Sequence, residues 1–364
     1  MVEYNKKIKD LEEQIAKTRY NKATSHAIGL YKAQLARLKE KQEARGSKKG
    51  KTEGYAVKRT GDATAVLVGF PSVGKSTILN RLTNQESEVA AYDFTTLTCI
   101  PGLLDYKHSK IQILDVPGIV RGASKGTGRG KEVLMVMRSA DLAIIIVDVT
   151  KPEQYPVLLK EIRDAHIRVN ARRPDIKIKK TSKDGVRIGK TVRMTHLDDQ
   201  TIKDILKEFR IQNADVLIRE DITDDQLIDV IEDNKKYIAG LTVLNKIDMV
   251  SRERAEAVMR KIKADIAISA RDAAHVDGLK DLIFQRLNFM RVCMKEPGKP
   301  ADMEIPLITF TGATIGDICN KLHRDFVDKF KFARVWGKSA KFPGQSLTLR
   351  HVMQDGDVLE IHLR

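Results

Sequence analysis

The chain has 364 residues, and its 65 Lys and Arg against 49 Asp and Glu give a formal net charge of +16 and a pI near 9.6. This length allows two or three domains, and the basic excess indicates polyanionic partners. The sequence shows no run of 18 apolar residues, no secretory leader and only three widely spaced cysteines. These features disfavour membrane, secreted, disulfide-stabilised and zinc-binding proteins and lead us to expect a cytoplasmic protein.

The first 45 residues carry two runs of apolar side chains at helical spacing, separated by a polar stretch at 21–25. The first run includes Ile8 and Ile15, and the second includes Ile28 and Leu35. This spacing predicts a helical hairpin with basic outer faces. The hairpin has two interpretations, a solvated pair of helices packed on the following domain or a contact with RNA or the ribosome. Residues 46–54, GSKKGKTEG, are expected to form a flexible linker.

Residues 69–76, GFPSVGKS, match the GxxxxGKS phosphate-binding loop. The loop follows an apolar run at 64–68 and precedes an expected helix at 76–82, which is the strand–loop–helix context that the motif requires. Its glycines let the backbone wrap so that successive N–H groups face phosphate oxygens. Lys75 would reach the β- and γ-phosphates, and the Ser76 hydroxyl would ligate Mg²⁺.

Residues 91–98, AYDFTTLT, lie where a switch segment must present a hydroxyl to Mg²⁺ and a backbone N–H to the γ-phosphate. Thr95 and Thr96, beside Phe94, are the candidates. An ordinary strand start is the alternative interpretation of the same residues.

A second apolar run, 111–114, ends in the DVPG sequence of residues 115–118. This position predicts that Asp115 lies at the carboxyl edge of a parallel sheet, where it would hold Mg²⁺ through a water molecule. Gly118 would bring a backbone N–H to the γ-phosphate. The next residue is Ile119, where Ras-like enzymes carry the glutamine that orients the attacking water. We therefore expect slow intrinsic turnover, on the order of 10⁻³ s⁻¹ or below, unless a partner assists.

Residues 141–149 and 152–166 predict one more strand and helix of the same sheet, whereas residues 167–238 exceed what that sheet needs. This surplus predicts a small α/β insertion with an extended segment at 167–170, a hairpin across residues 183–185, helices near 202–209 and 226–231, and a strand at 216–219. The hairpin is strongly basic and lacks aromatics, so it is either a solvated face or a surface for phosphate backbones recognised by shape. Its basic residues are Arg168, Arg172, Arg173, Lys177, Lys179, Lys180, Lys183, Arg187, Lys190 and Arg193.

The NKID sequence at 245–248 indicates which base is bound. Asp248 would accept two hydrogen bonds from guanine N1–H and N2–H₂, whereas adenine offers no such donor pair. Asn245 and Lys246 would hold the loop and pack over the base and the phosphate-binding loop. After an apolar strand at 266–268, residues Ser269, Ala270 and Arg271 would supply a backbone N–H to guanine O6. These boxes together predict binding of GTP.

The last 70 or so residues follow a PGKP linker at 297–300. Alternation at 305–310, helical spacing at 315–326 and short strands at 333–336, 347–349 and 358–362 predict a β-grasp-like layout. Trp336 is expected to be a core residue.

The sequences GFPSVGKS, YDFTTLT followed by Pro-Gly at 101–102, and DVPGIVRGASKGTGRG at 115–130 resemble the Obg-related GTPases, and most closely the developmentally regulated GTP-binding protein family. The resemblance spans nearly the whole chain, and the C-terminal part resembles a TGS domain. It implies that Thr96 and Ser76 are the Mg²⁺ ligands, and that the chain binds ribosomes, rRNA or tRNA and a regulatory partner protein. Relatives usually carry an acid at the position of Arg121, so the role of that acid is in doubt here. Some relatives use K⁺ held by an asparagine where this chain has Ser72, so K⁺ activation stays open.

We thus expect an α/β fold: a P-loop GTPase domain (55–296) built on a mostly parallel sheet with helices on both faces and interrupted by a basic insertion (167–238), preceded by a helical hairpin and linker (1–54) and followed by a TGS domain (297–364). The expected function is Mg²⁺-dependent hydrolysis of GTP to GDP in translation, without membrane association or DNA specificity. The alternatives are a non-catalytic nucleotide-dependent ribosome-binding scaffold and a GTPase associated with RNA modification. Lys75, Thr96 and Gly118 are the expected catalytic residues. The expected GTP-binding residues are Gly69, Phe70, Pro71, Ser72, Val73, Gly74, Lys75, Ser76, Thr77, Phe94, Thr95, Thr96, Asp115, Gly118, Asn245, Lys246, Asp248, Ser269, Ala270 and Arg271.

Overall fold

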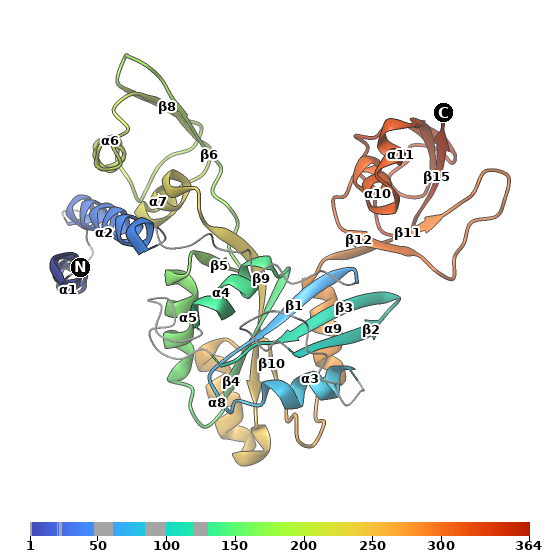
Figure 1. Cartoon of the computed structure of the whole chain (residues 1–364), viewed down its shortest axis with the longest axis horizontal. Coiled ribbons are helices and arrows are strands. Elements are labelled where there is room, and N and C mark those ends of the chain that lie inside the picture. The colour runs from blue at the N-terminus through green and yellow to red at the C-terminus, as the bar shows by residue number, and fades with distance from the viewer. Residues whose placement is uncertain (1, 20, 22–23, 47–60, 84–99, 119–129) are drawn as a thin grey trace. The chain divides into compact units, whose positions relative to one another are not determined.

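The computed structural model describes residues 2–19, 21, 24–46, 61–83, 100–118 and 130–364 (Figure 1). The chain divides into two compact units, one formed by residues 1–54 and 171–237 and the other by residues 55–170 and 238–364. The predicted α/β fold with a mostly parallel sheet is confirmed in the larger unit. Within the described ranges, no helix has the length and hydropathy needed to cross a membrane.

The larger unit is built on a sheet with strand order β10-β9-β4-β1-β3-β2, and β5 also pairs with β9. Along this path, β2 and β3 pair antiparallel, and all the other neighbouring strands pair parallel. The strands are β1 (Ala63–Val68), β2 (Ile100–Tyr106), β3 (Ser109–Asp115), β4 (Leu142–Asp148), β5 (Ile167–Val169), β9 (Lys236–Asn245) and β10 (Ile266–Ala267).

Helices cover both faces of this sheet, which explains why its central strands are almost wholly apolar. Along β1, Val66 and Val68 join the core that includes α4 (Gly130–Ser139), α5 (Gln154–Asp164) and α8 (Arg252–Ile262). Ala65 and Leu67 join the opposite core, with α3 (Lys75–Thr83) and α9 (Val276–Arg286). Successive residues of one strand therefore anchor two helical layers, and the carboxyl ends of the parallel strands are brought to one edge.

The larger unit also contains a five-stranded sheet of order β12-β11-β15-β13-β14. Its strands are β11 (Phe289–Met294), β12 (Leu307–Phe310), β13 (Phe330–Trp336), β14 (Gln345–Leu347) and β15 (Asp357–Leu363), and its helices are α10 (Ile315–Leu322) and α11 (Asp325–Asp328). The sheet already includes β11, which precedes the expected boundary at residue 297. The helix expected at 315–326 is divided, because His323 adopts an extended conformation between α10 and α11.

In the smaller unit, the hairpin predicted across residues 183–185 is wrong in its pairing. Strand β8 (Ala214–Ile218) lies between β6 (Ile176–Lys180) and β7 (Val186–Lys190), antiparallel to the first and parallel to the second. Strand β8 is central because it is the most apolar of the three and buries Ala214, Val216 and Ile218 on one face. The turn between β6 and β7 crosses the end of β8, where Asn213 holds it. The Asn213 carbonyl oxygen accepts from the Thr181 N–H at 3.1 Å, and its Oδ1 accepts from the Gly185 N–H at 2.9 Å.

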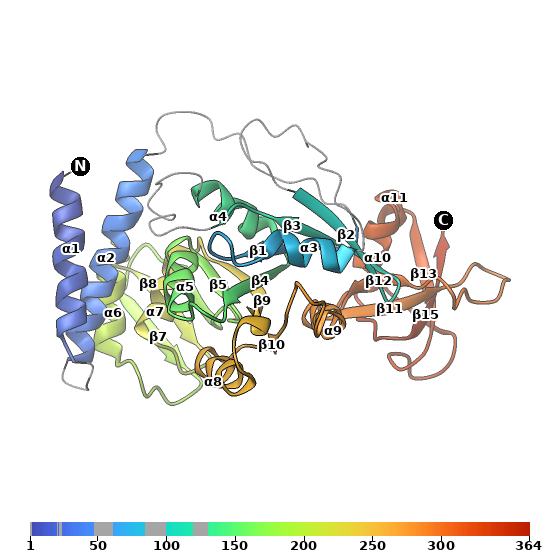
Figure 2. The same ribbon diagram turned by 90° about the horizontal axis from the view of Figure 1, so that it is seen from below.

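The two N-terminal helices, α1 (Val2–Lys17) and α2 (Ser25–Gly46), lie side by side as predicted (Figure 2). Helix α2 packs on α6 (Asp199–Glu208) and α7 (Asp224–Glu232) of the insertion, which the sequence did not indicate. Small residues allow the close approach: Ala33 is fully buried in the core of this unit, and a Cβ at Gly29 would lie 3.4 Å from the Thr201 methyl group.

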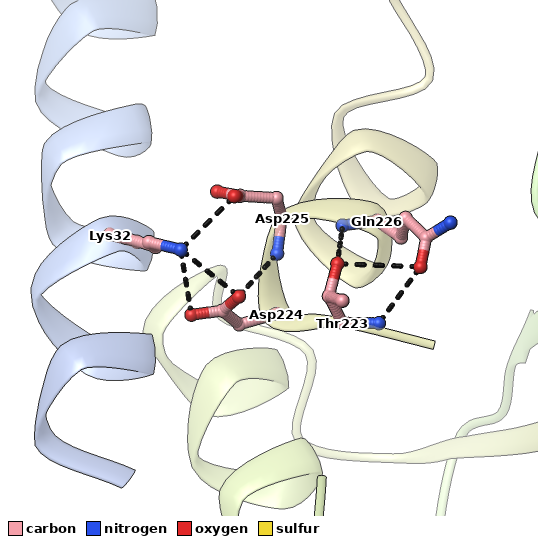
Figure 3. A network of polar contacts seen from close by, with 5 residues as sticks. All are labelled: Lys32, Thr223, Asp224, Asp225 and Gln226. Carbon is pink, nitrogen blue, oxygen red and sulfur yellow. Dashed lines mark hydrogen bonds and ion pairs between the residues drawn. The ribbon is translucent and has the colours of Figure 1, made fainter. Parts of the chain in front are cut away.

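Ion pairs also stabilise the contact between α2 and α7. The Lys32 amine lies 3.1 Å from Asp224 and 3.0 Å from Asp225, both in the first turn of α7 (Figure 3). Burial lowers the pKa of Lys32, but the two carboxylates outweigh it and the pKa is raised. Thr223 and Gln226 cap the same helix end reciprocally (Figure 3). The N-terminal hairpin is thus part of one compact unit with the insertion.

Candidate nucleotide-binding site

The predicted phosphate-binding loop joins the carboxyl end of β1 to the first residue of α3, as the motif requires. Gly74 has φ +95°, and a Cβ there would lie 2.5 Å from the Asn245 Nδ2. A Cβ at Gly69 would lie 2.7 Å from the Ile146 carbonyl oxygen. Gly74 is therefore favoured by its positive φ and Gly69 by the close backbone of β4, and these contacts place the loop against the edge formed by β4 and β9.

The polar groups at the phosphate end are bonded to one another. The Lys75 Nζ donates to the Phe70 carbonyl oxygen at 3.2 Å, and the Ser76 hydroxyl donates to the Asp115 Oδ2 at 2.5 Å. Burial lowers the pKa of Lys75 and raises the pKa of Asp115. The charge of each residue partly offsets the pKa shift of the other. A hydroxyl and a carboxylate oxygen facing each other form an oxygen donor pair that suits a hard cation such as Mg²⁺ once phosphate oxygens complete the shell.

Gly118, the last residue of DVPG, lies against the phosphate-binding loop. A Cβ at this position would lie 2.5 Å from the Pro71 nitrogen and 2.9 Å from the Phe70 carbonyl carbon. Only glycine fits this approach. Register pairs Asp115 at the end of β3 with Leu67 on β1, so the DVPG box and the loop meet at the same sheet edge.

Asn245 and Ser269 join the NKID sequence at 245–248 to the loop that follows β10. The Asn245 Nδ2 donates to the Val73 carbonyl oxygen at 2.8 Å, and its Oδ1 accepts from the Ala270 N–H at 3.1 Å. The Ser269 hydroxyl donates to the Asp248 Oδ1 at 2.7 Å and also contacts Asp272. One buried asparagine thus ties the phosphate-binding loop to the loop that follows β10.

Two further residues support this end of the site, and the sequence analysis missed both. The buried Asp148, at the end of β4, pairs with Lys246 at 2.8 Å and accepts from the backbone N–H and the hydroxyl of Thr150. Burial raises the pKa of Asp148, but the hydrogen bonds from Lys246 and Thr150 lower it more. Arg81, in the last turn of α3, donates to the carbonyl oxygens of Ala270 and Arg271. The only sequence signal for Asp148 was its position at the end of a buried parallel strand.

The expected site residues within the described ranges gather at the carboxyl edge of the parallel sheet. They are residues 69–77, Asp115, Gly118, Asn245, Lys246, Asp248 and Ser269 to Arg271. Phe94, Thr95, Thr96, Ile119 and Arg121 lie outside the described residues.

Comparison with protein-family models finds matches along most of the chain. Residues 64–180 match a family described as 50S ribosome-binding GTPase, residues 183–289 match the C-terminal region of that domain, and residues 290–363 match the TGS domain. The predicted P-loop GTPase fold with a C-terminal TGS domain is thereby confirmed.

Full-length relatives agree with these matches. The chain is 50% identical to the uncharacterized GTP-binding protein MJ1326 of Methanocaldococcus jannaschii, covering 98% of this chain and 92% of that protein. It is 42% identical to Developmentally-regulated G-protein 3 of Arabidopsis thaliana, covering 98% and 97%. It is 41% identical to the human Developmentally-regulated GTP-binding protein 2, covering 98% of each.

Among solved structures, the chain is similar to the FeoB G-domain from Methanococcus jannaschii, with 16% identity and a TM-score of 0.35 over 62% of this chain and 97% of that one. So distant a similarity does not bear on function. The three motif boxes at one sheet edge and the full-length relatives together identify the chain as a member of the developmentally regulated GTP-binding protein family, GTPases of the Obg type.

Proposed function

We propose that this chain is a Mg²⁺-dependent switch that hydrolyses GTP to GDP and phosphate and acts in translation on the ribosome. The observation that carries the nucleotide part is the bonded set of Asn245, Asp248 and Ser269 beside the phosphate-binding loop. An acceptor carboxylate held next to a backbone amide matches the N1–H, N2–H₂ and O6 edge of guanine, whereas adenine would leave the carboxylate unpaired.

The protein groups proposed for hydrolysis act by positioning and by charge. Lys75 would exchange the Phe70 carbonyl for the β- and γ-phosphate oxygens, and the Gly118 N–H would face the γ-phosphate. Mg²⁺ held by Ser76, Thr96 and, through water, Asp115 would neutralise charge on the phosphate oxygens. Water would attack in line. Because Ile119 replaces the water-orienting glutamine, we propose that efficient turnover requires a group from a partner, the ribosome or a bound K⁺.

Single-turnover release of γ-phosphate, measured with and without ribosomes at two K⁺ concentrations, tests this function. We expect slow release by the protein alone, on the order of 10⁻³ s⁻¹ or below, and faster release with ribosomes. Ile119 favours one rival function, a nucleotide-dependent scaffold without catalysis. GTP binding with no hydrolysis under any of these conditions would establish that rival.

The basic residues of the smaller unit support the ribosomal part of the proposal, because some of them form ion pairs with acidic neighbours and others do not. Arg172, Arg173, Arg187 and Lys190 form ion pairs of 2.5–2.8 Å with acidic neighbours. By contrast, four exposed basic residues of β6 and the following turn have no ion pair among the described residues: Lys177, Lys179, Lys180 and Lys183. Lys177 and Lys179 alternate with the inward Ile176 and Ile178, so they point from the open face of the sheet.

We therefore propose that the β6 lysines contact the phosphate backbone of rRNA or tRNA. Reversing Lys177, Lys179 and Lys183 to Glu should lower ribosome affinity at least tenfold and reduce the salt-dependence slope by about 2–3, because each lost phosphate contact removes nearly one released counterion. A control reverses Arg172, Arg173 and Lys190, which changes the net charge equally. Equal loss in both variants would indicate only net charge, and no loss in either would make β6 a solvated face. Cosedimentation at several salt concentrations measures both.

We further propose a cytoplasmic location and association with a regulatory partner protein. Both rest on membership of the family rather than on a feature of the site. Pull-down of the tagged chain from a native extract, followed by identification of stoichiometric partners, tests the second.

A further inference from the structure

Arg81 connects the two ends of the nucleotide site through a single short helix. It lies six residues after Lys75 on α3, about 9 Å farther along the helix axis. Its Nε donates to the Ala270 carbonyl oxygen at 3.1 Å, and its Nη2 donates to the Arg271 carbonyl oxygen at 2.8 Å. The planar guanidinium thus holds two successive peptide groups of the loop after β10.

Holding these carbonyl groups also determines where the neighbouring amides point. In a trans peptide the C=O and the following N–H point in opposite directions, and no cis peptide occurs in the described chain. The carbonyl of Ala270 faces Arg81, so the N–H of Arg271 faces away from it. The carbonyl of Arg271 faces Arg81 as well, so the N–H of Asp272 also faces away.

The hydrogen bonds on the far side of the loop agree with this direction. The Asp272 N–H donates to the Ser269 hydroxyl at 3.2 Å, and that hydroxyl donates to Asp248 at 2.7 Å. The Ala270 N–H is bonded to Asn245. The Arg271 N–H has no acceptor among the described residues, although the amides before and after it, those of Ala270 and Asp272, are both bonded.

We propose that Arg81 is a positioning residue for base specificity, which orients the Arg271 N–H to donate to guanine O6. This inference rests on the proposed binding of GTP. Adenine carries an amino group at the position of guanine O6. This group is a hydrogen-bond donor, so the Arg271 N–H would repel it.

The test uses the full-length chain with Arg81→Lys and Arg81→Met, titrated with GDP, IDP, 6-thio-GDP and ADP. A lysine cannot hold two carbonyl oxygens in the planar geometry, so both variants should bind GDP about tenfold more weakly, the loss of one well-placed hydrogen bond. The ratio of GDP to 6-thio-GDP affinity should fall towards one, since sulfur is a weak acceptor. The ratio of GDP to IDP affinity should not change, because the 2-amino group that IDP lacks is expected to donate to Asp248 and not to contact Arg271.

Arg286→Lys is the matched control. Arg286 is also exposed at the end of a helix and hydrogen-bonded, but its partner is Asp265 rather than the loop. Thermal melting of each unliganded variant checks that the chain remains folded. Arg81→Lys keeps the charge and serves if Arg81→Met unfolds.

The outcomes separate the two levels of the proposal. If the wild-type chain shows no preference for GDP over ADP, the proposed function itself fails. If the wild type prefers GDP but the Arg81 variants weaken GDP and 6-thio-GDP by the same factor, Arg81 only stabilises the loop and the inference is overturned. Unchanged GDP affinity in both variants overturns it as well.

Discussion

The base-binding end and the phosphate-binding end of the site differ in how their polar groups are engaged. At the base end, Asn245, Ser269 and Arg81 bond to loop backbone or to Asp248, and these bonds support the groups proposed to meet guanine. At the phosphate end, Lys75 is bonded to the Phe70 carbonyl and Ser76 to Asp115, so the groups expected to meet phosphate and Mg²⁺ satisfy each other.

This difference follows from the cost of leaving buried charge unpaired. Lys75 and Asp115 are both buried, so each needs a hydrogen-bond partner. At the phosphate end the bonded groups are the ones proposed to meet the nucleotide, whereas at the base end the bonds support the groups proposed to meet guanine. Three predictions test this contrast.

The largest effect is expected at the base end. Asp248→Asn should weaken GTP binding by about 10²-fold or more, because two charge-assisted hydrogen bonds of about 1.5–3 kcal/mol each are lost. Xanthosine triphosphate, which presents a complementary acceptor, should bind this variant better than GTP does. Calorimetric titration with both nucleotides measures the exchange. Unchanged GTP affinity would contradict the assigned role of Asp248.

A smaller effect is expected behind the same end. Asp148→Asn removes the charged partner of Lys246, and we expect about a tenfold loss of GDP and GTP affinity alike, corresponding to one charge-assisted hydrogen bond of about 1.5 kcal/mol. Equal loss for both nucleotides is the signature, since Lys246 is expected to pack over the base and not to contact the γ-phosphate. As a control, Asp277→Asn alters an exposed acid that pairs with Lys280 on α9. A loss confined to GTP would place Asp148 at the phosphate end instead.

The smallest effect concerns the stability of the unliganded protein. Because burial raises the pKa of Asp115 above its ordinary value of 3.8, the folded state disfavours the ionised form. Asp115→Asn should therefore raise the melting temperature at pH 7 by a few degrees at most while weakening Mg²⁺-dependent GTP binding. The gain should shrink as the pH falls through the raised pKa towards 3.8, where the wild-type carboxyl becomes protonated. Thermal melting across pH 4–8 measures it, and a destabilised variant at pH 7 would show that the Ser76–Asp115 bond outweighs burial.

Much of the site could be predicted because its chemistry lies in contiguous residues. A phosphate loop needs glycines, a lysine and a hydroxyl within eight positions, and the sequence contains them at 69–76. The predicted strands and helices of the parallel sheet fall within a few residues of those observed, since strands buried on both faces are continuous apolar runs.

The errors arose where neighbours in space are distant in sequence. The turn at 183–185 suggested that β6 and β7 pair, but β8, which follows α6, lies between them. Nothing local to α2 indicated that its small residues would pack on α6 and α7. Arg81 likewise looks like an ordinary helix-end arginine, because the carbonyl groups it holds lie 189 and 190 residues away.

The sequence by itself determined the fold class and the nucleotide class, and it named the groups expected to meet the nucleotide, because each is encoded by residue types at short, fixed spacing. Only the tertiary structure decided how those groups are held: Asn245 bridging to Val73 across 172 residues, Asp148 restraining Lys246, and Arg81 directing the loop after β10. The physical reason is that sheet order and packing bring these atoms together, and no local pattern encodes which distant carbonyl an exposed arginine will meet.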